Sequence, residues 1–163
     1  MKEYYPLLFT FRDVVSGNGF LSGVTLSGRM LMTREDDGKW WGYGVRPAAL
    51  AASGNTPQEA HYNFKNRYKE VLFDIAQEVA TFDSFRDEVE RFYYEPDQEE
   101  EGIWEAAVQA VRSGALVPEG PFSALPKQAP EERPSSISVE RLDHQVTRYA
   151  ATDNVPDLFA TAA

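Results

Sequence analysis

The tetrapeptide Thr56-Pro57-Gln58-Glu59 constrains the fold of this chain more than any other feature of its sequence. The hydroxyl of Thr56 can accept a hydrogen bond from a free N–H group at a helix start, and Pro57 suits the first helical position, where no backbone donor is needed. Glu59 can reach back to complete a capping box. We therefore expect a helix to begin here, at the point where the spacing of apolar residues changes from two to three or four.

Upstream of that point the sequence predicts antiparallel β-structure. Apolar and polar side chains alternate, and Ser16–Gly19, Ser27-Gly28 and Asp37-Gly38 have the composition of tight turns. Pro47 lacks the N–H that a ladder needs and should end the last strand, although residues 48–54 have room for a short edge strand. The expected sheet has about four strands, at residues 5–15, 20–26, 29–35 and 39–45.

Gly42 and Gly44 lie inside the last of these strands, where glycine normally weakens the ladder. Two explanations are open. One is a bulge or the close approach of another backbone, and the other is cover of the bare positions by Trp40, Trp41 and Tyr43. We favour cover by the aromatic side chains.

Downstream of Thr56 the pattern is helical. An apolar stripe from Ala60 to Val79 predicts a long helix that packs across one face of the sheet. His61, Lys65 and Lys69 lie on a different face of this helix, where three basic side chains indicate solvation rather than a phosphate site.

Two further helices should follow the long one. The second begins after a break at residues 81–84, where Ser84 and Asp87 repeat the capping pattern, and it ends before Pro96. The third begins with acidic residues that suit the positive end of a helix dipole, and Ser113-Gly114 ends it. The expected fold class is α+β: an antiparallel sheet packed by a long helix, then two more helices.

Five prolines between residues 118 and 134 mark an extended segment. We expect an α+β body over residues 1–116, a Pro-rich linker over 117–136 and a C-terminal strand and tail over 137–163. Within the last segment, Ile137–Leu142 has the pattern of one strand and Val155–Phe159 that of a short docking segment.

The negative charge is concentrated in the middle of the chain. Residues 74–101 carry two basic and eleven acidic side chains, whereas residues 1–73 carry nine and seven. Such a block repels phosphate backbones, so nucleic acid is not expected to contact it. It suits a solvated face or a basic protein partner, and the solvated face is the simpler reading.

No pattern of a reaction appears in the sequence. Cysteine is absent and His61 and His144 are the only histidines, so ligands for transition metals are scarce. Neither histidine lies in a nucleophile motif, and no phosphate-binding loop precedes a helix. Asp36-Asp37 sits at a hairpin tip, where desolvation is small, and the acids at 97–101 suit a helix start better than a magnesium site. We expect no enzyme, no cofactor and no metal.

The N-terminal segment MKEYYPLLFTF lacks the basic and apolar regions of a signal peptide. No apolar run approaches the roughly 18 residues of a membrane span. We expect a soluble, cytoplasmic protein without a membrane partner.

One stretch resembles a known family. Asp37-Gly38, an aromatic strand, Pro47 and then Gly54-Asn55-Thr56-Pro57-Gln58-Glu59-Ala60 opening an amphipathic helix are similar to the pattern of HicB antitoxins. The resemblance covers residues 34–75. It implies a partial RNase H-like fold in a non-catalytic protein that neutralises a small basic RNA-cleaving toxin by covering its active surface. Homo-oligomers are possible within this interpretation.

The resemblance and the charge pattern together define a candidate contact surface. The acidic block would complement a basic toxin and steer its association. The candidate partner-binding residues are Trp40, Trp41, Tyr43, Glu95, Asp97, Glu99, Glu100 and Glu101. The alternative is a stand-alone protein-binding inhibitor or adaptor, phage or defence related, on the same scaffold; a hydrolase with RNase H-like acids ranks last.

Overall fold

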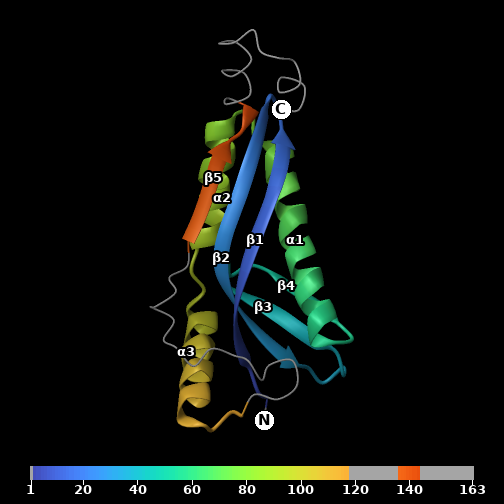
Figure 1. Ribbon diagram of the computed structural model, residues 1–163, viewed down its shortest axis with the longest axis vertical. Coiled ribbons are helices and arrows are strands. Elements are labelled where there is room, and N and C mark those ends of the chain that lie inside the picture. The colour runs from blue at the N-terminus through green and yellow to red at the C-terminus, as the bar shows by residue number, and fades with distance from the viewer. Residues whose placement is uncertain (1, 118–135, 144–163) are drawn as a thin grey trace, which may run out of the picture.

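The computed structural model of the chain describes residues 2–117 and 136–143 (Figure 1). It has the expected α+β fold. In chain order the elements are β1 (Tyr5–Gly17), β2 (Phe20–Arg34), β3 (Trp40–Arg46), β4 (Ala51–Gly54), α1 (Pro57–Glu78), α2 (Phe82–Tyr94), α3 (Gln98–Ser113) and β5 (Ser136–Arg141).

β1 and β2 form one long antiparallel hairpin. Residue pairs run from Gly17↔Phe20 to Tyr5↔Met32, and Gly19 supplies the positive φ of 78° that the two-residue turn requires. The prediction that Ser27-Gly28 separates two strands was wrong, because β2 continues through it. The glycine has another reason to be there. A Cβ at residue 28 would collide with the carbonyl oxygen of Arg46 and with the ring of Phe9.

Strand β2 is the centre of the sheet, in which the strand order is β1-β2-β3-β4. One edge of β2 pairs with β1 along its length. The other edge is shared end to end, because β3 pairs with residues 29–34 and β5 pairs with residues 22–27. β5 confirms the strand expected near 137–142, and it places residues 136–141 in the same sheet as the body.

The explanation we favoured for Gly42 and Gly44 was wrong. A Cβ at Gly44 would collide with the carbonyl oxygen of Pro47, and the side chain of Met30 lies over Gly42. The cause is therefore close approach of neighbouring groups. Trp41 and Tyr43 alternate with the glycines along β3 and so lie on the opposite face of the sheet.

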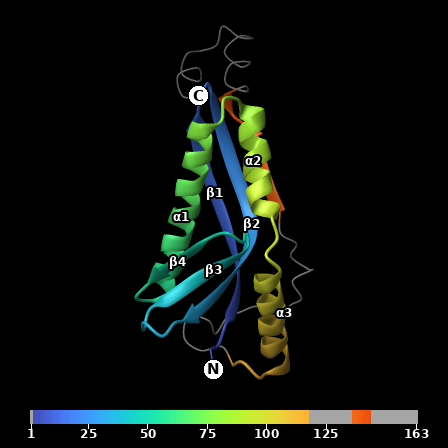
Figure 2. The same cartoon turned by 180° about the vertical axis from the view of Figure 1, so that it is seen from behind.

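Helices α1 and α2 cover one face of the sheet. In Figure 1 β5 lies in front of α2, and in Figure 2, which views the molecule from behind, α2 lies in front of β5. Between helices and strands lies the main core, which includes Phe9, Phe64, Tyr68, Phe85 and Val89. Aromatic edges meet ring faces across it, as in Phe9 and Phe64, whose centroids are 5.2 Å apart.

The helix starts were predicted with one error. Thr56 Oγ1 accepts from the N–H of Glu59 at 3.1 Å, as expected, while the Glu59 carboxylate accepts from the N–H of Asn55 at 3.2 Å. The cap of α2, however, is Thr81 and not Ser84. Starting the helix one turn earlier buries both Phe82 and Phe85 against the core.

Helix α3 packs on the opposite face of the sheet. Leu31, Val45, Trp104 and Ala107 form a second core there, with Tyr4 and Leu8 of the N-terminal strand region packed against it. Asp97 caps the helix start and Gly114, at φ 81°, caps its end. The expected linker, apart from Val117 and Ser136, and the expected docking segment Val155–Phe159 lie outside the described residues.

Candidate partner-binding surface

Strand β3 positions two of the predicted aromatic residues. Because side chains alternate along a strand, Trp41 and Tyr43 both lie on the face that α3 covers. Their rings are stacked, with centroids 6.0 Å apart and planes 11° apart. The indole N–H of Trp41 also donates to the carboxylate of Asp37 at 3.3 Å. The pair is thus held rigidly by its turn and its strand.

The start of α3 brings the acidic residues to the same side of the sheet. The carboxylate of Asp97 accepts from the N–H of Glu100 at 3.2 Å, and Glu99, Glu100 and Glu101 form the first turn. Glu101 makes an ion pair with Arg46 at 3.4 Å, which ties α3 to the end of β3. Acids in this position are favoured by the helix dipole, so the local sequence itself concentrates negative charge here.

The pKa values of two groups report this electrostatic environment. Burial raises the pKa of Tyr43 to about 12, with further contributions from Glu35, Tyr4 and Glu100. Burial also raises the pKa of Glu100, and the charges of Asp97 and Glu99 add to the effect. Both shifts mean that a further negative charge is unfavourable at this surface. An approaching cation would relieve the repulsion.

Tyr94 extends the surface at the end of α2. Its side chain is 50% exposed, although it is large and apolar. The guanidinium carbon of Arg46 lies 5.9 Å from the centroid of its ring. We refer to this group of residues as the acidic-aromatic surface; its members are Trp41, Tyr43, Tyr94, Glu99, Glu100 and Glu101.

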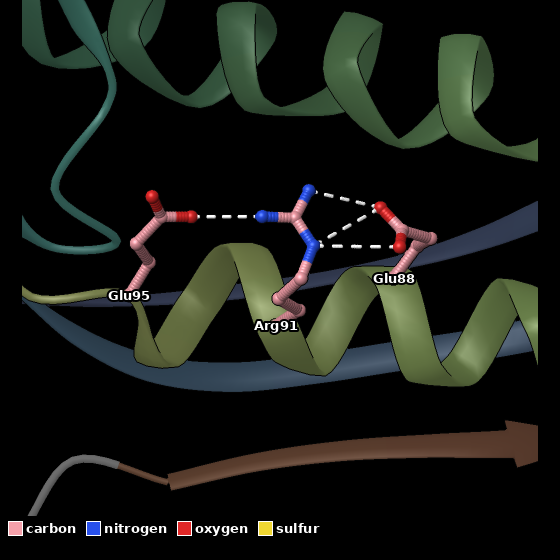
Figure 3. Close-up of polar contacts among 3 residues, drawn as sticks. All are labelled: Glu88, Arg91 and Glu95. Atoms are coloured by element: carbon pink, nitrogen blue, oxygen red, sulfur yellow. Dashed lines mark hydrogen bonds and ion pairs between the residues drawn. The ribbon is translucent and has the colours of Figure 1, made fainter.

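Three predicted site residues are not part of this surface: Trp40, Glu95 and Asp97. Trp40 lies on the opposite face, with its ring centroid 6.3 Å from that of Tyr5. Glu95 follows α2, and its carboxylate is directed along that helix to Arg91 at 2.8 Å (Figure 3). Arg91 also pairs with Glu88, so the Glu95 carboxylate takes part in an ion-pair network along α2. Asp97 is close to the surface, but its side chain serves as a cap.

Sequence reasoning missed Arg46 and Tyr94. Arg46 reaches the surface through a shift in register, which no sequence signal marks. Tyr94 follows Tyr93, whose hydroxyl donates to the carbonyl oxygen of Ser27 at 2.6 Å inside the protein. Two adjacent tyrosines at a helix end do not reveal which of them faces solvent.

The basic face predicted on α1 is partly neutralised. Lys69 pairs with Asp13 at 3.2 Å, and burial lowers the pKa of His61, with Lys65 adding to the effect. Among residues 2–117 and 136–143, no group of three or more histidine or acidic side chains is arranged to hold a metal ion. Within those same ranges, no helix is long and apolar enough to cross a membrane.

Comparison with known proteins gives no relative: no family model matches the chain, and no curated protein or solved structure is significantly similar to it.

Proposed function

We propose that this protein is a non-catalytic binding protein that holds a small basic protein on its acidic-aromatic surface. The observation that carries the proposal is the first turn of α3, where three glutamates lie on the same side of the sheet as the stacked Trp41–Tyr43 pair and the charge of Glu100 acts on Tyr43. Arg46 pairs with Glu101. Glu99 and Glu100 make no ion pair within the described residues, and they remain available to a cationic partner.

Rigid aromatic side chains next to uncompensated acids are a suitable combination for recognition. The aromatic rings supply apolar area with little loss of conformational freedom, as interface anchors do. The acids supply long-range attraction that accelerates encounter and orients the partner. Because exposed charges are screened within about 10 Å at 0.1 M salt, such binding should weaken as salt is raised.

The resemblance to HicB antitoxins suggests which kind of partner this is. We propose a small basic RNA-cleaving toxin, neutralised in the cytoplasm when the acidic-aromatic surface covers its active surface. The resemblance rests on the Asp37-Gly38 turn, on Pro47 and on the helix start at Thr56. The basic partner rests on the charge of α3 alone, so the two parts of the proposal can fail separately.

The test is co-expression with the product of a small basic open reading frame next to this one. We expect the two proteins to co-purify, and we expect this protein to restore growth when the neighbour is toxic. Co-purification without toxicity would reject the antitoxin role and favour the alternative of a stand-alone inhibitor. Failure of both readouts would reject the proposal.

A pair of matched variants tests the surface. The double variant E99K/E100K reverses two charges at the start of α3 and leaves the Glu101–Arg46 pair intact. The control D74K/E78K makes the same change in net charge on the exposed side of α1, which packs on the other face of the sheet. We expect the first variant to lose at least tenfold in affinity and the control to lose little. Equal losses would mean that only net charge matters.

A further inference from the structure

Strand β1 has one edge that no other strand covers in the described parts of the chain. β1 is the first strand in the order β1-β2-β3-β4, and across residues 2–117 and 136–143 it pairs with β2 alone. The corresponding edge of β2 is filled at residues 22–27 by β5. An uncovered edge presents backbone N–H and C=O groups with which a further strand can pair.

This edge is open in its middle and closed at both ends. The N–H of Val14 donates to the carboxylate of the preceding residue at 2.7 Å, so it points away from β2. Because the direction of the backbone groups alternates along an antiparallel strand, the N–H groups of Leu8, Thr10 and Arg12 point the same way. The next position of this series is Pro6, which has no N–H. The available edge is therefore the stretch between Pro6 and Val14.

Helix α1 flanks this edge on one face of the sheet. Lys69 of the helix pairs with Asp13 of β1 at 3.2 Å, and its ammonium lies 6.0 Å from the centroid of the Phe73 ring. Tyr62 lies seven residues before Lys69, so Tyr62, Lys69 and Phe73 share one side of the helix. Tyr62 is 65% exposed and Phe73 is half-buried. A strand added to β1 would therefore have apolar surface of α1 to pack against.

The charge around this edge is mainly positive. Arg12 is exposed on the face of the sheet away from α1, and Lys65 lies one turn before Lys69 on the helix. Within the parts of the chain that the structure describes, neither Arg12 nor Lys65 makes an ion pair, and Asp13 offsets Lys69 alone. Acidic side chains would be attracted here.

We propose that the β1 edge and α1 bind an extended acidic segment of another protein by β-strand addition. Leu8, Thr10 and Arg12 exchange main-chain hydrogen bonds with this segment, whose side chains alternate between the two faces of the sheet. Acidic side chains lie on the face of Arg12, and apolar ones lie on the face of Tyr62. β5 shows the same arrangement within this fold, because it adds to β2 and packs its apolar side against the main core.

A second copy of the chain fits this edge less well. α1 lies against β1 through Phe64 on Phe9 and Tyr68 on Phe11, with ring centroids 5.2 and 5.0 Å apart. Two β1 strands paired edge to edge would be about 4.8 Å apart. Because each helix follows its strand, the two α1 helices would come almost as close, whereas packed helices need about 8–10 Å between their axes. A segment without a helix of its own on that face is the better occupant.

The test uses a synthetic peptide, acetyl-Val-Glu-Val-Glu-Val-Glu-Val-amide, whose glutamates can lie opposite Leu8, Thr10 and Arg12. The backbone ¹H–¹⁵N signals of these three residues are followed by NMR at pH 7 and low salt. We expect the signals to move and to saturate. The same peptide with lysine in place of glutamate should bind at least about tenfold more weakly, because its charges are repelled. Methylating the N–H of the central glutamate removes a bond of the new ladder and should also weaken binding.

Variants of the protein locate the site. T10P removes the central N–H of the edge, which points away from β2, so the β1–β2 ladder is kept and peptide binding should fall at least about tenfold. T10S keeps this N–H and is its control. R12E should also weaken binding and does not depend on the folding of T10P. R112E makes the same charge change at an exposed position in the last turn of α3, and it should leave binding unchanged.

Several outcomes would overturn the proposal. They are unmoved signals at Leu8, Thr10 and Arg12, equal binding of the glutamate and lysine peptides, and equal binding by R12E and R112E. Slow hydrogen exchange of the three amides in the free protein, or signals that move with protein concentration alone, would show an edge that is already paired and would reject it too. Because the probe is a peptide and the acidic-aromatic surface is unaltered in these variants, failure of the antitoxin role leaves the result unaffected.

Discussion

Glu100 is half-buried at the start of α3, and its position affects stability. Its pKa is raised by burial first and then by Asp97 and Glu99. A carboxyl group whose folded pKa lies above its unfolded value holds its proton more tightly in the folded state. It therefore favours folding most below the unfolded pKa, and this contribution is lost as the pH rises through the folded pKa.

The variant E100Q removes this unfavourable charge. We expect its melting temperature to exceed that of the unaltered protein at pH 7 and to equal it at pH 3, where the carboxyl is protonated in both states. Thermal denaturation followed by circular dichroism at the two pH values measures the difference. E105Q, at an exposed position of the same helix, is the control. A lower melting temperature for E100Q at pH 7 would show that its interaction with the helix dipole dominates.

Replacing each of two glycines with alanine should have opposite effects on stability. G44A brings a Cβ against the carbonyl oxygen of Pro47, so it should destabilise the protein by about 1–3 kcal/mol. G102A lies inside α3 with open space around it, so it should stabilise the protein by up to about 1 kcal/mol. Urea denaturation measures both. If G44A left the free energy of unfolding unchanged, the explanation that aromatic side chains cover a bare position would be favoured again.

Individual residues also show which features could not be predicted from the sequence. The sequence indicates that Gly42 and Gly44 are unusual in a strand, but it does not show that the side chain of Met30 approaches Gly42 and the backbone of Pro47 approaches Gly44. The same limit applies to the aromatic residues of β3. Whether Trp40 or Trp41 faces α3 depends on the register of the strand, and a shift of one residue exchanges the two faces.

At the scale of elements, local signals were the most reliable. The cap at Thr56, the acids that open α3 and Gly114 at its end depend on neighbours within four residues, and each was predictable. The continuous β2 was not, because Gly28 has the same composition signal as a turn. It is explained by Phe9 and Arg46, which are distant in sequence.

The start of α2 offers a test of the corrected cap. Thr81 Oγ1 accepts from the N–H of Ser84 at 3.1 Å, so T81A should cost about 1 kcal/mol of stability. S84A should cost much less, because Ser84 contributes its backbone N–H to the cap and its hydroxyl only receives a bond from Thr81. Denaturant unfolding compares the two. If S84A cost more stability than T81A, Ser84 rather than Thr81 would be the cap of α2.

At the scale of the whole molecule, the candidate surface depends on packing that no local signal encodes. The sequence predicts both the acids of α3 and the aromatic strand, but not that this helix crosses to the opposite face of the sheet from α1 and α2. That crossing follows from Leu31, Val45 and Trp104, which form a second core at the end of the sheet. This packing brings the acids of α3 and the aromatic residues of β3, which are separate in the sequence, to one side of the sheet.

At the end of the sheet away from α3, β5 makes the comparable packing contacts. Val139 pairs with Val24 and packs against the main core, whereas Ser138 pairs with Thr25 and faces solvent. The end of β5 is held further by the N–H of Leu142, which donates to the carbonyl oxygen of Leu21 at 2.7 Å. β5 therefore completes both the hydrogen-bond ladder of β2 and the apolar cover beside α2.

Matched asparagine variants on β5 test whether this strand stabilises the whole domain. V139N places a polar amide against the core and removes apolar packing, so it should cost at least about 2 kcal/mol. That loss corresponds to a fall in melting temperature of roughly 4–8 °C for a chain of this size. S138N changes only the solvent face and should leave the melting temperature within about 1 °C, as surface substitutions usually do.

Hydrogen exchange in V139N should accelerate at the β2 amides of residues 22–27, which face β5, and much less at residues 29–34, which pair with β3. Equal melting temperatures for the two variants would show that β5 adds nothing to the stability of the body, and that the edge of β2 is stable without it.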